Sequence, residues 1–220
     1  MLRPLAKLLS LLFHPLFVVT YLLLLLFAVN PYLFSIQDAK GQGLVLISVL
    51  FLSVLFPLVV IIMLRFLGFI ESLELKDRME RIGPLIGTGL FYMWLYINIY
   101  QNPAIPRAFS LVVLGSTIGL FLAFFMNNFS KVSLHAVGMG GFVTAILLIR
   151  FLFSYDYFIL GLGPVGTYKI HPDLLVYGSI IIAGLVGSSR LYLNAHSRDQ
   201  VMGGFLIGVI AQIIAFRFMY

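Results

Sequence analysis

Apolar residues dominate the chain in long runs, and most polar residues are confined to the short segments between these runs. A helix needs about 20 apolar residues to cross a bilayer, whereas an unpaired strand in lipid would leave its backbone polar groups without hydrogen bonds. The pattern therefore predicts an all-α, polytopic transmembrane helical bundle with about seven spans. The predicted spans cover residues 8–28, 44–64, 85–100, 109–126, 134–153, 174–193 and 201–218.

The first apolar run lies where a signal peptide would lie, but it is longer than such a peptide and no small-residue cleavage site follows it. We therefore expect a retained first helix. The linkers carry turn-forming Pro, Gly and Asn residues, none is long enough for a second domain, and no repeat of 20–50 residues is present. The sequence predicts a single integral membrane domain over residues 1–220.

The composition narrows the class of protein. Hydrophobic residues make up 61% of the chain and charged residues only 10%, and the mean hydropathy is +1.08. A soluble domain averages about 25% charged residues and needs them for its surface. A cytosolic domain, a disordered protein and an ordinary nucleic-acid binder are therefore excluded. Cysteine is absent, which excludes disulfides, thiolate catalysis and Cys-ligated metals.

The basic residues are unevenly distributed between the two sides that alternating loops define. Nine of the 14 Lys and Arg residues lie on the side that holds the N-terminus, and five lie on the other side. The positive-inside rule would place the first side in the cytoplasm. Six of these nine lie in segments that also carry candidate chemistry, so the rule alone does not orient the chain.

Three polar segments stand out on that first side, at residues 75–84, 131–136 and 189–200. About 50 residues separate one from the next, which is enough for a helical hairpin to leave and return. Ionisable residues at membrane depth are functional candidates by default. Lys and Arg can cradle a phosphate, Ser and helix-start N–H groups add donors, one histidine can attack phosphorus and a second can protonate the leaving oxygen. With enough cations, such a site needs no metal.

The third segment carries the most specific pattern. It contains Ser189-Arg190, then five residues, then His196, with Gln200 four residues later. This arrangement resembles the third motif of the type-2 phosphatidic acid phosphatase superfamily, which reads Ser-Arg, five residues, His, three residues, Asp. Gln200 stands at the Asp position.

The other two segments resemble the remaining motifs of the superfamily in order and spacing. In the second motif, Pro-Ser-Gly-His, Ser133 and His135 match and the Pro and Gly positions differ. In the first motif, Lys, six residues, Arg-Pro, Lys76 and Pro84 match and Gly83 occupies the Arg position. The resemblance spans roughly residues 65–210, and it implies a six-helix phosphatase-like core with one additional helix.

The resemblance also implies roles for these residues. By similarity, His196 is the nucleophile that attacks phosphorus and His135 is the general acid. The residues that would bind the substrate phosphate by similarity are Lys76, Ser133, Ser189 and Arg190. We further conjecture that Arg78 or Arg81 replaces the Arg missing at Gly83. Gln200, at i+4 from His196, or Asp199, at i+3, would orient the nucleophile.

The function implied is metal-independent hydrolysis of a lipid phosphomonoester or pyrophosphate through a phosphohistidine. We expect no cofactor, metal or nucleic acid, and as partners a phosphorylated lipid substrate and membrane lipids. The expected location is a multi-pass protein of the bacterial cytoplasmic (inner) membrane.

Three alternatives remain open. A catalytically impaired relative could bind or translocate phosphorylated lipids. An ion-coupled transporter ranks low because the spans contain almost no Asp or Glu. Finally, individual residues have structural interpretations: an interfacial snorkelling pair for His196 and Arg190, a buried hydrogen-bonded histidine for His135, and headgroup contacts for Lys131 and Arg198. We assign His14, which precedes Pro15, only to a kink in the first helix.

Overall fold

The computed structural model describes residues 2–36, 38–75, 77–153, 156–161 and 166–220. Among these residues, seven helical segments are long and apolar enough to cross a membrane, which confirms the predicted all-α, multi-pass bundle. They are Leu2–Val29, Ala39–Phe66, Met79–Gln101, Arg107–Asn127, Leu134–Phe153, Asp173–Tyr192 and Arg198–Met219.

The last four spans are single α-helices: α6 (Arg107–Asn127), α7 (Leu134–Phe153), α8 (Asp173–Tyr192) and α9 (Arg198–Met219). The third consists of a short 3₁₀ turn, η4 (Met79–Arg81), that leads into α5 (Ile82–Gln101). The first two spans are interrupted, and a further 3₁₀ turn, η2 (Pro31–Leu33), links them.

The first span breaks at His14-Pro15, where α1 (Leu2–Leu12) gives way to the 3₁₀ turn η1 (Pro15–Phe17) and then to α2 (Val18–Val29). Proline lacks the N–H that an α-helix needs in its interior, which explains the break. The His14 imidazole accepts a hydrogen bond from the Leu16 N–H at this junction.

The second span contains a π-helical turn, η3 (Phe51–Leu55), between α3 (Ala39–Leu50) and α4 (Phe56–Phe66). Ser53, in this turn, is fully buried, and its Oγ lies 3.5 Å from the Oγ1 of Thr20 on α2. The wider turn thus coincides with a polar contact between the first two spans.

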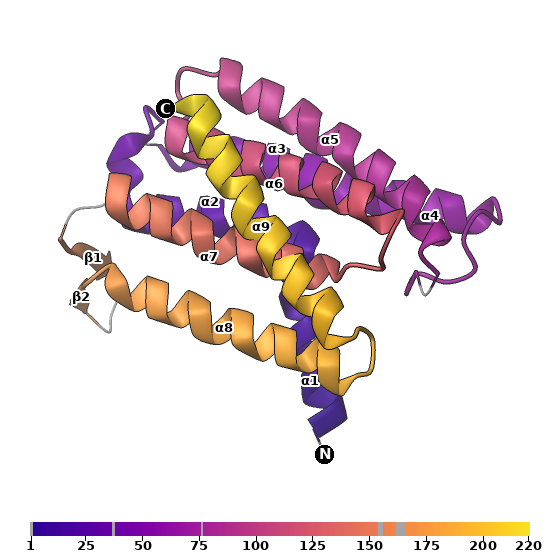
Figure 1. The fold of residues 1–220 in the computed structure, drawn as a ribbon. Coiled ribbons are helices and arrows are strands. Elements are labelled where there is room, and N and C mark those ends of the chain that lie inside the picture. The colour runs from indigo at the N-terminus through magenta and orange to yellow at the C-terminus, as the bar shows by residue number, and fades with distance from the viewer. Residues whose placement is uncertain (1, 37, 76, 154–155, 162–165) are drawn as a thin grey trace.

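The bundle has two distinct ends (Figure 1). What we call the near end holds the N-terminal end of the chain, at the bottom of Figure 1, and the segments 67–75, 77–78, 128–133 and 193–197, at its right. What we call the far end holds the α2–α3, α5–α6 and α7–α8 connections and the C-terminus. All three polar segments of the sequence therefore meet at the near end.

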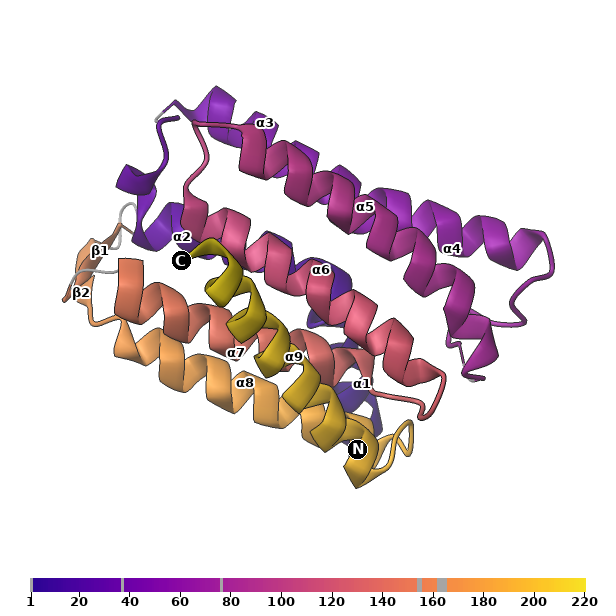
Figure 2. The same ribbon diagram turned by 45° about the horizontal axis from the view of Figure 1, so that its top comes forward.

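Helix α9 runs obliquely across α6 and α7, and glycines allow it to lie close to them (Figure 2). A Cβ on Gly208 of α9 would overlap the Val137 carbonyl oxygen of α7, and one on Gly140 of α7 would overlap the Phe205 carbonyl oxygen. Small residues at such crossings let two helix backbones approach closely. This contact fixes the register between the helix that follows His196 and the helix that carries His135.

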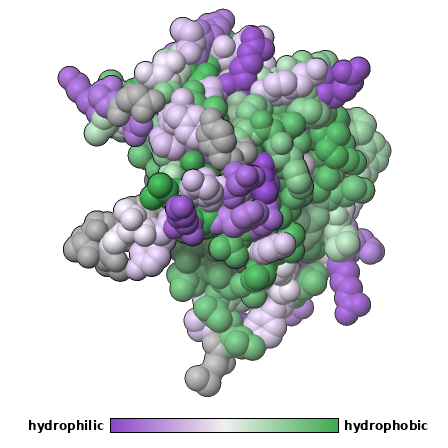
Figure 3. Space-filling view, turned by 90° about the vertical axis from the view of Figure 1, so that its left-hand side faces the viewer, coloured by the Kyte–Doolittle hydropathy of each residue, from purple (hydrophilic) through white to green (hydrophobic). Residues whose placement is uncertain are grey.

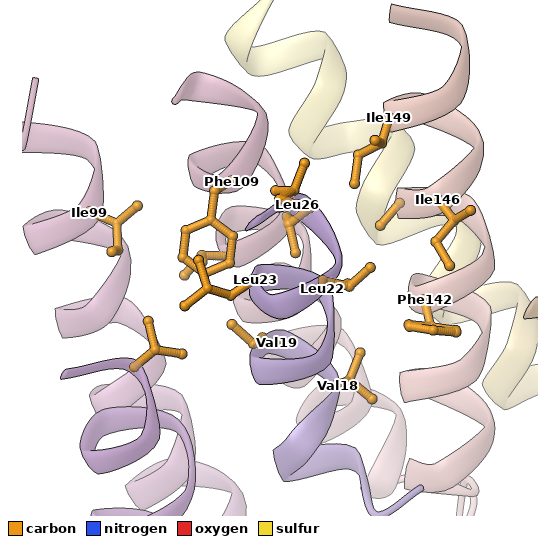
Figure 4. Close-up of a cluster of buried hydrophobic side chains, with 14 of the residues drawn as sticks. Val18, Val19, Leu22, Leu23, Leu26, Ile99, Phe109, Phe142, Ile146 and Ile149 are labelled. Carbon is orange, nitrogen blue, oxygen red and sulfur yellow. The ribbon is translucent and has the colours of Figure 1, made fainter. Parts of the chain in front are cut away.

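Helix α2 forms the centre of the apolar core (Figure 4). Its fully buried leucines contact Phe109 of α6 on one side and Ile146 of α7 on the other. The core therefore joins the N-terminal and C-terminal halves of the chain across the interior of the bundle.

The α7–α8 connection contains a small antiparallel hairpin that the sequence analysis does not predict. Strand β1 (Phe158–Gly161) pairs with β2 (Thr167–Ile170), with Phe158 opposite Ile170. The hairpin lies beyond the helix ends, where its edges can be solvated. Figure 3 views this far end, where hydrophilic groups project among broad apolar areas.

Candidate functional site

The candidate site is centred on the α8–α9 connection at the near end. Helix α8 ends at Tyr192, and Ser197 caps α9 by accepting the Gln200 N–H at 3.4 Å. The Gln200 side chain reaches back, and its Oε1 accepts the Ser197 N–H at 3.3 Å. This reciprocal capping box holds Gln200 directly beneath His196.

His196 is 9% exposed, and its Nδ1 lies 3.1 Å from the Oε1 of Gln200. The oxygen of Gln200 is the acceptor in both of its contacts, so Nδ1 of His196 carries the proton and donates it. In the neutral ring, Nε2 then keeps its lone pair, because the hydrogen bond made by one ring nitrogen determines the state of the other. Asp199 is exposed and is not a hydrogen-bond partner of His196 among the described residues.

Burial lowers the pKa of His196 to about 4, and the charges of Arg81, Arg190 and Lys131 act in the same direction, whereas the hydrogen bond that His196 donates to Gln200 opposes them. The imidazole is therefore neutral at physiological pH. A neutral histidine with a free Nε2 among three cations is suited to approach an anionic phosphorus centre.

Ser133 and His135 lie at the start of α7, beside the α9 N-terminus. Ser133 is fully buried, its N–H donates to the Gln200 carbonyl oxygen at 3.2 Å, and its Oγ accepts the Ala136 N–H at 3.4 Å. The His135 Nε2 lies 2.9 Å from the carbonyl oxygen of Ser10 on α1. A carbonyl can only accept, so Nε2–H of His135 is the donor.

His14 also belongs to this cluster, which the sequence analysis does not predict. Its ring centroid lies 5.3 Å from that of His135, at an interplanar angle of 85°. The sequence signal that could have placed His14 in the site is a histidine followed by a proline within an apolar run. In the sequence analysis, this pattern is assigned only to a kink in the first helix. Arg190 lies within electrostatic reach of His14, His135 and His196.

Arg81 is buried and fastens two near-end segments together. Its Nε donates to the Leu75 carbonyl oxygen at 3.1 Å, and its Nη1 donates to the Val132 carbonyl oxygen at 2.8 Å. Two of the guanidinium nitrogens, Nε and Nη1, therefore already donate hydrogen bonds to backbone carbonyl oxygens. Arg81 contributes positive charge to the site and positions the loop that leads into Ser133.

Arg190, in the last turn of α8, differs from Arg81. Its Nε is buried and has no hydrogen-bond partner among the residues that the structure describes. An unsatisfied buried guanidinium N–H is costly, and an anionic ligand would satisfy it. The neighbouring Ser189 is buried, but its hydroxyl donates to the Leu185 carbonyl oxygen of its own helix at 2.8 Å.

The other basic residues lie at the margin of the site. Arg78 is exposed, and its Nη1 donates to the Asn128 carbonyl oxygen at 3.2 Å. Lys131 is half-buried. Burial lowers its pKa, with the charges of Arg81 and Arg190 adding to this effect and those of Asp77 and Glu80 opposing it. Lys131 therefore lies in the same electrostatic cluster, rather than only among lipid headgroups.

The first motif is only partly visible. Lys76 lies outside the described residues. A Cβ on Gly83 would lie 2.9 Å from the Leu64 Cδ1, so this position packs against α4. A larger side chain at this position would have to move the end of the Leu64 side chain aside. Among the described residues, no group of three His, Asp or Glu residues is arranged to hold a metal ion.

Comparison of the chain with protein-family models, with curated proteins and with solved structures found no match.

Proposed function

We propose that this protein is a membrane-embedded phosphatase that hydrolyses a lipid phosphomonoester or pyrophosphate without a metal. The observation that carries the proposal is the hydrogen bond from His196 Nδ1–H to Gln200 Oε1, which leaves the lone pair on Nε2 of the neutral ring, with Arg190 within electrostatic reach. The resemblance of the three polar segments to the phosphatase motifs supports the same chemistry.

In the proposed reaction, Nε2 of His196 attacks phosphorus and the bond from phosphorus to the lipid oxygen breaks. That oxygen takes a proton from His135, which enters this step as an imidazolium and leaves it neutral, and departs as the lipid alcohol, or as a lipid phosphate when the substrate is a pyrophosphate. Water then attacks the phosphohistidine, returns a proton to His135 and releases inorganic phosphate. Arg190 neutralises the transferred group, and Arg81 and Lys131 add positive potential.

The substrate binds with its phosphate at the near end and its hydrocarbon tail in the bilayer. The cluster lies at the ends of helices that are long and apolar enough to cross a membrane, which is where a lipid headgroup would meet it. For His135 to donate from Nε2, its hydrogen bond to the Ser10 carbonyl must open. We place the enzyme in a bacterial inner membrane.

The test is phosphate release from a panel of lipid phosphates by purified protein. We expect release by the wild type and by His171→Ala, because His171 lies at the far end, and none by His196→Ala. Equal release by His196→Ala and the wild type would refute the proposal.

A second candidate is a protein that binds or translocates phosphorylated lipids without turnover. The commitment of His135 Nε2 to the Ser10 carbonyl and the amide in place of a carboxylate at Gln200 favour it. Saturable binding of a lipid phosphate that requires Arg190, with no phosphate release, would select this function.

A further inference from the structure

A second candidate site lies at the far end, on the opposite side of the bundle from His196. It is a cavity of about 340 Å³ between the end of α5, the start of α6 and the end of α9. This volume lies within the range of small-molecule sites, about 300–1,000 Å³. The start of α6 and the C-terminus lie close together in Figure 1.

Arg107, the first residue of α6, supplies the charge of this cavity. Its guanidinium carbon lies 5.8 Å from the centre of the Tyr100 ring. It forms no ion pair with a carboxylate among the described residues, whereas Arg150 at the same end pairs with Asp173 at 2.6 Å. Within the described part of the chain, Arg107 is therefore a cation without a paired carboxylate.

Three tyrosines lie near the charge of Arg107. Tyr96 and Tyr100 line the cavity from α5. Burial raises the pKa of Tyr220 while the charge of Arg107 lowers it, which places that phenol within electrostatic reach of the guanidinium. Phenol hydroxyls can donate hydrogen bonds to an anion, and tyrosine is typical of the headgroup level of a membrane.

The cavity is apolar along its depth. Leu114 and Ile118 line it together with Arg107. At spacings of 7 and 11 residues, these three side chains lie on one face of α6, and the face extends for about 16 Å from the charge. Phe218 and Met219 of α9 also line the cavity. A charged mouth with an apolar cleft beneath it matches an amphiphile.

We propose that this cavity binds an anionic glycerophospholipid, with its phosphate on Arg107 and part of one acyl chain along Leu114 and Ile118. Arg107 provides charge-assisted hydrogen bonds to the phosphate, and the N-terminus of α6 adds a favourable dipole. This lipid is a ligand and not a substrate, since the candidate nucleophile lies at the other end of the bundle. The site does not depend on the proposed phosphatase activity.

The test is native mass spectrometry of the full chain, purified in detergent and titrated with phosphatidylglycerol or with phosphatidylcholine. We expect one phosphatidylglycerol to bind more tightly than the rest, with its affinity lowered about tenfold in Arg107→Gln. Arg217→Gln is the matched control, because Arg217 is exposed in the last turn of α9 and does not line the cavity. Its affinity should equal that of the wild type.

A second variant tests the apolar part of the site. Ile118→Phe narrows the cleft without changing charge, and we expect it to weaken phosphatidylglycerol binding as well. Inorganic phosphate should not displace the lipid. Equal affinity of the wild type and Arg107→Gln, equal affinity for the two lipids, or displacement by phosphate would overturn the proposal.

Discussion

Nδ1 of His196 donates a hydrogen bond over 3.1 Å to Oε1 of Gln200, which lies four residues further along the chain, in the first turn of α9. The same oxygen accepts the Ser197 N–H, so the cap of α9 and the orientation of the imidazole share one acceptor. An amide can hold a neutral imidazole in one tautomer as a carboxylate does, but it cannot stabilise an imidazolium by charge. The pair therefore supports a nucleophile and supports a protonated histidine poorly.

Replacing Gln200 tests this relationship. Gln200→Leu removes the acceptor, and we expect kcat for phosphate release to fall about 10- to 100-fold, as for other orienting partners. Gln200→Asp adds a negative charge beside His196, which raises the pKa of the imidazole, so the acidic limb of the pH–rate profile should move to higher pH. Asp199→Asn, one residue away, should leave both kcat and the position of the acidic limb unchanged. If Gln200 served only to cap α9, its replacement would lower activity without moving the acidic limb of the pH–rate profile.

The lowered pKa of His196 predicts a pH dependence of stability. The unfolded chain takes up a proton near the ordinary value of 6.5, whereas folded His196 takes it up near 4. The free energy of unfolding should therefore fall as pH drops from about 6.5 to about 4 and level off below that range. Thermal unfolding of the wild type and His196→Gln in detergent isolates this contribution. Parallel melting temperatures of the two proteins across this window would contradict it.

The contact between α7 and α9 predicts different effects for two glycines of the same helix. Gly208→Ala places a methyl group against the backbone of α7, and we expect a loss of about 1–3 kcal/mol or more in stability. A Cβ on Gly203 meets nothing within 4 Å, so Gly203→Ala should change stability by less than about 1 kcal/mol. Thermal unfolding of the two variants tests this prediction. Equal melting temperatures of Gly208→Ala and Gly203→Ala would show that the close contact between α7 and α9 does not contribute to stability.

Arg81 and Arg190 should respond in opposite ways to replacement by glutamine. Arg190→Gln removes a half-buried cation whose buried Nε–H is unsatisfied among the described residues, so we expect unchanged or higher stability and a loss of kcat/KM of about 100-fold or more. Arg81→Gln leaves two carbonyls without their donor and should cost about 2 kcal/mol or more in stability. Paired melting and activity measurements test this. A destabilised Arg190→Gln protein would assign that residue a structural role.

The sequence contains enough information for the seven spans and for the end at which the polar segments meet. A run of about 20 apolar residues is stable in lipid as a membrane-spanning helix. Because consecutive spans run in opposite directions, residues 75–84, 131–136 and 189–200 come to the same end. The four-residue spacing of His196 and Gln200 predicts their contact, although His196 precedes α9 and the capping box, rather than helical geometry, brings the two side chains together. These features depend on local periodicity, which can be recognised along the chain.

Contacts between distant segments could not be predicted in this way. The approach of Ser10 and His14 to His135 depends on how α1 turns at Pro15, and no local pattern specifies that direction. Arg81 was expected to bind phosphate, yet two of its donor groups contact backbone carbonyls that only the folded loops bring near it.

The π-helical turn at Phe51–Leu55 has a consequence for how the chain can change in length. Adding one residue to a regular α-helix rotates everything beyond it by about 100°, whereas a π turn absorbs the additional residue within a wider loop of backbone. Deleting one residue there could restore α geometry without shifting Asp38 at the start of the span or Arg65 at its end. This turn is therefore where an insertion or deletion could be accommodated during evolution while the rest of the bundle kept its alignment.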